Sequence, residues 1–529
     1  MESAGSLHAR IATLVHAHFD ALPARSKPIV RDDGTREWIP MSGIVIVKGR
    51  APDAPGLYSG TQREYFLEDI NLSGAKCLPA SQIPHCKGLV LHDSHAEILA
   101  LRAFNYWLLS ECQGFLAAER NHTTDPSQTP PYQSPYLRRR RSCSAQEPPL
   151  ELQPDLKIYM YCTCAPCGDA SMELCMASQQ DATPWEVETN NTETRSTAAP
   201  SSDADTLLDG RGYFSRLGII RRKPARADAE STRSKSCSDK LSLRQVASLL
   251  SYETSLLVAT TQNAYLEGVI LPEEEISRVA CDRAFGEQGR MRELAGRFWT
   301  SQSETAGSIE PGGQRQMGKE GVYGYRFRPF RVLSIPSALL ESLWKYRKAS
   351  PGVSVDSLGS AKNTKPGVVS AIWTIAPSFS EPPSTSANNG AKSLPVLHGS
   401  RTGLYETILN GVKQGSRASE PKARGASALS RAKMWGLLRD IVVSDCSAEI
   451  SLSGRESKTD KTQLNEVLRR VAGASSYREF KKTPSVMTES IRARKRAIQD
   501  TKSVLGDWVP NSGDEYWDLS VLVNPPKKR

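Results

Sequence analysis

Three short stretches carry side chains whose types and spacing suit metal chemistry. The stretch LHDSHAEILA places His95 two residues before Glu97, at the start of an apolar run. The stretch CTCAPCGDASMELC, residues 162–175, contains four cysteines, and the stretch S-C-S-D-K contains Cys237. Imidazole nitrogens and thiolates bind zinc, and a carboxylate beside a bound metal can transfer protons. Together the three stretches predict a zinc site with an acid-base residue next to it.

The first stretch also has a simpler structural interpretation. Ser94 and Glu97 fit the S-x-x-E capping box, and the apolar residues that follow have helical spacing. A cap and a metal site are compatible, because the cap would orient the helix that presents the histidine.

The cysteines of the second stretch differ in how well they suit a metal. Cys167 follows Pro166 and precedes a predicted helix, and the free N–H groups at a helix N-terminus stabilise a thiolate. Cys162 and Cys164 lie on a strand-like segment, where residues two apart face the same side of a sheet. These two remain either competing ligands or structural thiols.

The combination of H-A-E, P-C-G-D and S-C-S-D-K resembles the adenosine-to-inosine editase family, the zinc deaminases that act on adenosine in RNA. The wider deaminase signature has a second cysteine where this sequence has Ala170. In the editase family the cysteine of S-C-S-D-K replaces it, so the resemblance implies that His95, Cys167 and Cys237 hold one Zn²⁺ ion. It also implies that Glu97 shuttles protons while a zinc-activated water attacks C6 of adenine and ammonia leaves.

Within this family the sequence is similar to the tRNA-specific adenosine deaminases. A short basic K-P-x-R-x-D segment leads into Cys237, where the enzymes of double-stranded RNA have a longer loop. We also expect no separate double-stranded-RNA-binding domain, since few residues precede the first predicted strand, 37–49. The resemblance implies that the substrate is adenosine 37 beside the anticodon of alanine tRNA. Lys223 and Arg226 would then contact the RNA backbone, unless they belong to a solvated basic loop.

Two other functions fit parts of this pattern. One is an editing deaminase of double-stranded RNA or messenger RNA that lacks accessory domains, and the other is a non-catalytic RNA-binding protein of the same fold. The presence of Glu97 argues against the second, because a scaffold does not need a proton shuttle.

Members of this family enclose inositol hexakisphosphate, so the resemblance implies a second cofactor. A polyanion explains basic side chains in segments that otherwise read as core. The family's Arg-Trp pair after S-C-S-D-K appears here as Leu243-Arg244, in a shifted register. For each candidate the alternative is an ordinary surface cation. The candidates are Lys240, Arg244, Lys433, Tyr477, Lys481 and Trp508.

The resemblance implies an α/β fold with a cytidine-deaminase-like sheet core flanked by helices and a helical C-terminal extension. Alternating strand and helix patterns in the first half agree with it. We expect a single domain over 1–529 with a core at about 37–523. Several polar segments are too poor in apolar residues to bury a core, so we expect disordered insertions there. They lie near 119–154, 181–210, 300–320, 350–366, 376–398, 414–428 and 445–462.

Composition and charge narrow the possible partners and cellular locations of the protein. The 529 residues include 11 cysteines and carry a net charge of +10, with a pI near 9.0, which favours a polyanionic partner. Neither a signal peptide nor a long apolar stretch is evident, so we expect no membrane span and no secretion. A location in the cytoplasm or nucleus favours metal binding over disulfides for the clustered cysteines.

Overall fold

The structure is a computed structural model, and it describes most of the chain. The described residues are 6–32, 35–49, 66–74, 76–124, 133–140, 147–179, 214, 216–223, 230–300, 323–348, 364–379, 402–452, 471, 473–482, 488–506 and 508–523.

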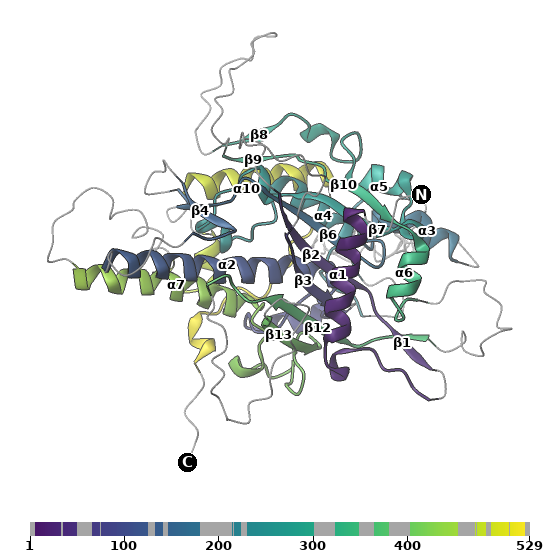
Figure 1. Ribbon diagram of the computed structural model, residues 1–529, viewed down its shortest axis with the longest axis horizontal. Coiled ribbons are helices and arrows are strands. Elements are labelled where there is room, and N and C mark those ends of the chain that lie inside the picture. Colours follow the sequence, from purple (N-terminus) through teal and green to yellow (C-terminus); the bar gives the residue numbers. More distant parts are fainter. Residues whose placement is uncertain are drawn as a thin grey trace, which may run out of the picture.

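An eight-stranded mixed sheet forms the centre of the molecule (Figure 1). Its strands, from one edge to the other, are β10 (Arg331–Ile335), β7 (Leu266–Pro272), β6 (Leu156–Cys162), β2 (Met41–Lys48), β3 (Phe66–Ser73), β12 (Val369–Ile375), β13 (Thr402–Leu409) and β14 (Val412–Lys413). β7 pairs in parallel with β6 and with β10, whereas β2 is antiparallel to both β3 and β6. The expected α/β class with a sheet core is therefore confirmed.

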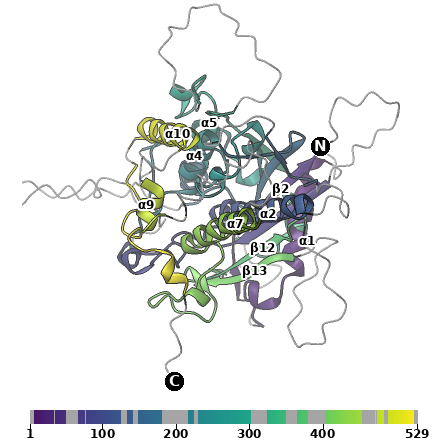
Figure 2. The ribbon, with the colours of Figure 1, turned by 90° about the vertical axis from the view of Figure 1, so that its left-hand side faces the viewer.

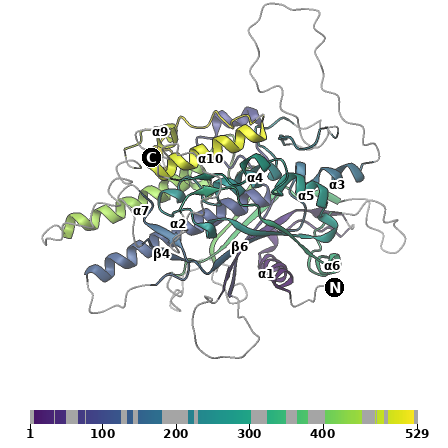
Figure 3. The ribbon, with the colours of Figure 1, turned by 90° about the horizontal axis from the view of Figure 1, so that it is seen from above.

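Helices cover both faces of this sheet. They are α1 (Leu7–Ala21), α2 (Ala96–Thr124), α3 (Met172–Ala177), α4 (Cys237–Ala247), α5 (Arg278–Phe285), α6 (Ser337–Leu343), α7 (Arg431–Leu452), α9 (Tyr477–Lys482) and α10 (Glu489–Leu505). In Figure 2, α1 lies to the right of β12 and β13, whereas α4, α7 and α10 lie to the left. Helices α2 and α7 run side by side, and α10 packs on α4 (Figures 1 and 3).

The central strand β2 shows why both faces must be covered. Its first seven residues, in the run MSGIVIVK, are all buried, so neither face can remain in water. On one face α1 approaches so closely that a Cβ atom at Gly43 would lie 2.8 Å from a methyl carbon of Val15. The glycine therefore lets the first helix pack directly on the sheet.

None of the described helices is long and apolar enough to cross a membrane.

Three two-stranded sheets lie around the central sheet. β1 (Arg36–Trp38) pairs with β11 (Thr364–Pro366), β4 (Leu137–Arg139) with β5 (Leu150–Leu152), and β8 (Phe298–Trp299) with β9 (Tyr325–Arg326).

Parts of the expected insertions are ordered. The segment 119–154 contains the end of α2 and the strands β4 and β5, and α7 extends into 445–462. The segment 414–428 is packed, because Ser427 is buried and its hydroxyl donates to Glu406 Oε2 at 2.6 Å. For these parts the prediction of disorder was wrong, since long-range contacts replace the missing apolar periodicity. The segment 181–210 lies outside the described residues, as do most of 300–320, 350–366 and 376–398.

Candidate metal centre and adjoining cavity

The structure brings His95, Cys167 and Cys237 together. His95 Nδ1 lies 3.8 Å from Cys167 Sγ and 3.7 Å from Cys237 Sγ, and the three donor atoms all lie within 4.8 Å of one another. Zinc bonds of about 2.0–2.3 Å in a tetrahedral site place ligand atoms roughly 3.3–3.8 Å apart. The donor set and its spacing therefore fit zinc, and we call these three residues the metal centre.

A hydrogen bond between the two thiols makes one of them more acidic. This bond with Cys237 holds the pKa of the Cys167 thiol well below its usual range, and the nearby ammonium of Lys223 lowers the pKa further. The backbone N–H of Cys237 also points at Cys167 Sγ, at 3.4 Å. The helix N-terminus that faces Cys167 is thus that of α4, and not that of the short helix that follows Cys167 in sequence.

The S-C-S-D sequence has a clear structural role at the start of α4. Ser236 is the N-cap, and its hydroxyl accepts the N–H of Asp239 and donates to Asp239 Oδ2 at 2.6 Å. Asp239 also accepts Arg290 Nη1 at 2.7 Å. This N-cap fixes Cys237 as the first residue of the helix, and its side chain is buried.

The P-C-G-D sequence is fitted against that helix start. Gly168 has a φ of +105°, and a Cβ atom there would lie 2.2 Å from Ser236 Oγ. The hydroxyl of Ser238 donates to the carbonyls of Pro166 and Cys167 and accepts the N–H of Ala170. Position 170 therefore lies beside α4, which supplies the third donor from Cys237.

Glu97 lies in the first turn of α2, two residues after His95, and is 5 % exposed. Burial raises the pKa of its carboxyl group, and the neighbouring Cys167 raises it further. A carboxyl group in this environment holds a proton more readily than one in water, which suits a residue that passes protons. At the start of α2, the backbone N–H of His95 donates to Asp93 Oδ1 at 3.0 Å, so Asp93 orients the residue that carries the imidazole.

Lys223 is buried next to the metal centre. Its ammonium donates to both carboxylate oxygens of Asp93, at 3.1 and 2.9 Å, and to Cys237 Sγ at 3.3 Å. The sequence analysis predicted that Lys223 contacts the RNA backbone. A phosphate could bind this ammonium only if the ammonium first left Asp93 and Cys237. Arg226, the other predicted RNA contact, lies outside the described residues.

Asp93, which the sequence analysis did not single out, joins the metal centre to a second basic group. Besides Lys223 it accepts hydrogen bonds from Lys240 Nζ and from Ser234 Oγ, the latter at 2.8 Å. Although burial favours the neutral acid, the two lysines hold the pKa of Asp93 well below its usual range. The clue in the sequence was its position, two residues before the predicted ligand.

Cys162 and Cys164 do not join the metal-ligand groups that the described residues form. Cys162 is buried on β6 and accepts a hydrogen bond from Ser42 Oγ at 3.3 Å. Burial raises the pKa of its thiol well above the usual range, which suits a neutral thiol within the core.

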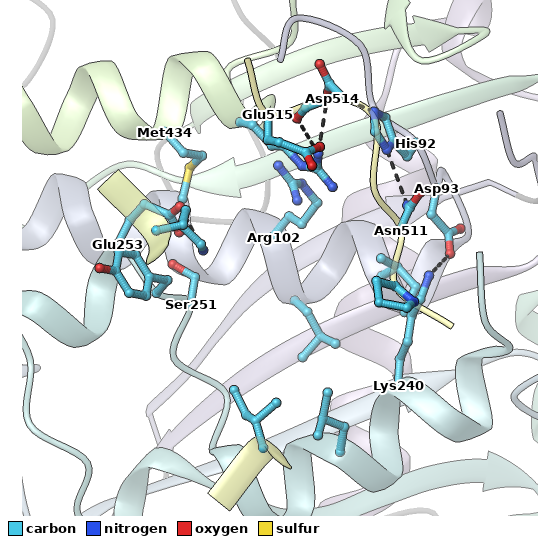
Figure 4. Close-up of a pocket in the computed structure, with 18 of the residues that line it drawn as sticks. His92, Asp93, Arg102, Lys240, Ser251, Glu253, Met434, Asn511, Asp514 and Glu515 are labelled. Carbon is cyan, nitrogen blue, oxygen red and sulfur yellow. Dashed lines mark hydrogen bonds and ion pairs between the residues drawn. The ribbon is translucent and has the colours of Figure 1, made fainter. Parts of the chain in front are cut away.

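A cavity of about 560 Å³ adjoins the metal centre on the side of Lys240. Figure 4 shows Lys240 reaching from its helix toward Asp93, with Arg102 and Glu253 further along the same space. Five of the six residues predicted to bind a polyanion line this cavity: Lys240, Arg244, Tyr477, Lys481 and Trp508. Lys433 does not line it, whereas the neighbouring Arg431 and Met434 on α7 do.

The cavity is strongly basic. Its lining includes nine Lys and Arg residues against four Asp and Glu residues. Burial lowers the pKa of Lys481 to about 8, and the buried Nε of Arg494 has no hydrogen-bond partner among the described residues. Cations gathered in this way repel one another and lack solvation, so the donor set fits a multivalent anion. The sequence analysis missed six of the nine: Arg102, Arg431, Arg478, Lys482, Arg494 and Lys502.

Comparison with known proteins agrees with this geometry. Residues 72–316 match the adenosine-deaminase (editase) domain. A protein of Schizosaccharomyces pombe named tRNA-specific adenosine deaminase 1 is 29% identical over 507 residues, which cover 96% of this chain and 95% of that protein. The protein of the same name from Saccharomyces cerevisiae is 29% identical over 250 residues, 47% of this chain and 55% of that protein. Mouse double-stranded RNA-specific editase B2 is 30% identical over 130 residues, 25% of this chain and 14% of that protein.

Proposed function

Because this chain belongs to the adenosine-deaminase (editase) family and is a deaminase, we propose that it is a zinc enzyme that converts adenosine to inosine in transfer RNA. One observation carries the proposal: a buried glutamate stands two residues from the imidazole of a histidine-dicysteine centre with zinc-like spacing. We further propose adenosine 37 of alanine tRNA as the target. A transfer-RNA substrate would place the enzyme in the cytoplasm or nucleus.

The net reaction consumes water and releases ammonia. A zinc ion held by His95, Cys167 and Cys237 would supply a Lewis acid that makes a bound water more acidic. Glu97 accepts the proton of the attacking water and delivers protons to N1 of adenine and to the departing amino group. Its burial favours this exchange, because a raised pKa lets the carboxyl group hold the proton between the two transfers.

The remaining polar groups position the centre. The ammonium of Lys223 donates to Cys237 Sγ and is itself held by Asp93, so it offsets the negative charge of two thiolates. Groups of this kind, one bond away from a ligand, fix its orientation and charge.

The extent of the similarities supports a transfer-RNA substrate. The fission-yeast relative, whose name assigns it to transfer RNA, aligns over nearly the whole of both chains. The double-stranded-RNA editase aligns over a quarter of this chain. An anticodon-loop base is already unpaired, so the enzyme would need less energy to bring it into the site than a paired base would require.

We also propose that the basic cavity holds inositol hexakisphosphate. The support is the surplus of cations in the cavity lining and the unpaired Nε–H of the buried Arg494, which a ligand with several phosphates would satisfy. Protein purified without denaturation and then extracted with acid should release about one equivalent, detected by mass spectrometry. No release from active enzyme would contradict this part of the proposal.

The test of the main proposal combines metal analysis with sequencing. The purified enzyme should contain one zinc per chain and should convert one adenosine of alanine tRNA, read as guanosine after reverse transcription. Long duplex RNA should stay unedited under the same conditions. Editing of the duplex but not of transfer RNA would assign the other substrate, and absence of both activities from zinc-loaded protein would refute the proposal.

A further inference from the structure

The loop that precedes the catalytic helix closes on itself beside the metal centre. Residues 77–93 leave and return at one place, because Cys77 and Asp93 form an isolated β-bridge. The N–H of Leu78 donates to the carbonyl of His92 at 3.0 Å. Since His95 follows two residues after this closure, the base of the loop lies next to the reacting centre.

The tip of this loop presents a lysine in an unusual backbone conformation. Lys87 is exposed and has a φ of +48°, a left-handed conformation that glycine or asparagine adopts at lower cost. Such strain persists only where the surroundings hold it, and it is frequent at functional positions.

The residue after Lys87 shows what holds the turn. Gly88 donates its N–H to Asp514 Oδ1 at 2.8 Å and accepts the N–H of Ala432 at 2.9 Å. A Cβ atom on Gly88 would lie 2.1 Å from the ring of Trp517. Contacts with α7 and with the C-terminal segment thus fix the backbone of the turn, from which the exposed side chain of Lys87 extends.

A second segment brings more positive charge to the same place. Residues 411–425 follow β13, and the carbonyl of Gly411 accepts the N–H of Leu91 at 2.8 Å. Val412 and the partly buried Ala418 belong to a small apolar cluster with Leu78 and Ile83 of the loop. The two segments therefore form one unit, which we call the loop surface.

The loop surface carries exposed cations without acidic partners. Arg417 and Arg424 are exposed, and among the described residues no Asp or Glu forms an ion pair with them or with Lys87. Glu420, the acid of this segment, pairs with Lys422 at 3.3 Å, and Glu406 of the preceding strand β13 pairs with Lys413 at 2.9 Å. Unpaired exposed cations beside a nucleic-acid-processing site suit phosphate groups.

We propose that the loop surface binds the phosphate backbone of the RNA next to the reacting adenosine, with Lys87, Arg417 and Arg424 as its contacts. This inference rests on the proposed function, because an RNA substrate must extend beyond the base in the active site. The strain at Lys87 is then the cost of fixing the backbone position from which its ammonium reaches the RNA. Two arginines on the adjoining segment extend the positive surface along the strand.

Lys87→Asn tests the role of the lysine without damaging the fold. Asparagine is well suited to a φ of +48°, so the variant should melt at the same temperature as the wild type or higher. It should nonetheless bind transfer RNA more weakly and raise KM more than it lowers kcat. The slope of log Kd against log salt concentration should fall by about one, as for the loss of one phosphate contact.

The double variant Arg417→Gln/Arg424→Gln should reduce the salt slope by about two. Arg10→Gln is the matched control, because Arg10 is an exposed cation on α1, which covers the opposite face of the sheet. It should leave melting temperature, affinity and salt slope unchanged. Fluorescence anisotropy with labelled transfer RNA gives affinities, and inosine formation gives KM and kcat.

The outcomes separate this inference from the proposed function. Wild-type protein that edits transfer RNA, with affinity and salt slope unchanged in Lys87→Asn and in the double variant, would refute the loop surface alone. An equal loss in Arg10→Gln would also refute it, since any surface cation would then contribute. Wild-type protein that binds transfer RNA through these residues but forms no inosine would instead refute the proposed function.

Discussion

Ser238 holds the carbonyl oxygen of Cys167 with two hydrogen bonds, one from its hydroxyl and one from its backbone N–H, each 3.0 Å long. Because Ser238 directly follows Cys237, this pair fixes the two thiols relative to each other before any metal binds. The second serine of S-C-S-D-K is therefore a positioning residue for the metal centre, while the first one caps the helix.

Ser238→Ala should lower the affinity for zinc by about 10–100-fold, as is typical when a residue that orients a ligand is lost. Competition with a chromogenic chelator measures this affinity. Ser242→Ala is the control, because Ser242 lies one turn later on α4 and bonds to the carbonyls of Ser238 and Ala284. Both variants should lose roughly 1 kcal/mol of stability. A similar fall in zinc affinity in both would mean that Ser238 acts through the fold.

Cys237→Ala should remove the metal, because the remaining histidine and cysteine are too few for a stable zinc site. Cys162→Ala should retain one zinc per chain, since Cys162 is bonded to Ser42 within the core. Plasma emission spectrometry of the dialysed proteins measures the zinc content. Full zinc content in Cys237→Ala would contradict the ligand assignment.

Glu97→Gln should fold, retain zinc and lose about two to four orders of magnitude in kcat, because the amide cannot carry a proton between water and adenine. Glu119→Gln is the control on the same helix, since Glu119 pairs with Arg139 and lies outside the metal centre. Single-turnover deamination of transfer RNA measures the effect. Near-normal turnover in Glu97→Gln would place the proton shuttle elsewhere.

The basic cavity predicts an unusual dependence of stability on pH. Burial lowers the pKa of Lys481 to about 8 from 10.5, and it also lowers the pKa of Lys502 in the same lining. Between about 8 and about 10.5 the unfolded chain binds more protons than the folded protein, so stability without an anion should rise with pH over this interval. Inositol hexakisphosphate should remove the rise, because it favours the protonated lysines.

Thermal unfolding of anion-free protein from pH 6.5 to 9.5, with and without added inositol hexakisphosphate, measures both profiles. If the stability of the anion-free protein does not rise with pH, burial does not lower the pKa of these lysines. A rise that persists in saturating ligand would mean that the phosphates bind elsewhere.

The structure brings the three predicted ligands together, and each part of this group has a local sequence signature. His95 directly precedes the helix that carries Glu97, and the N-cap Ser236 fixes Cys237 as the first residue of α4. The burial of Lys223 was missed because its carboxylate partner, Asp93, comes from a segment 130 residues away. A short basic run looks the same in a sequence whether it meets solvent or an internal carboxylate.

The cavity was predicted only in part for a related reason. Arg494 lies on α10 in a run that is rich in basic residues, which is typical of an exposed helix. A usable signal was present, because Arg494 stands three residues from both Ile491 and Ala497 on the buried face. Arg102 is similarly placed among apolar residues of α2, where its guanidinium bonds to the carbonyl of Leu429 on a segment far away in sequence.

The walls of the cavity come from four separated parts of the chain, 90–105, 234–253, 431–434 and 477–515. During synthesis the last of these parts leaves the ribosome long after the first one. The cavity is incomplete before that moment, so a polyanion bound there, as proposed above, would be taken up only as α9 and α10 dock. The amount of that polyanion in the cell should then affect the yield of newly folded enzyme more than it affects enzyme that has already folded.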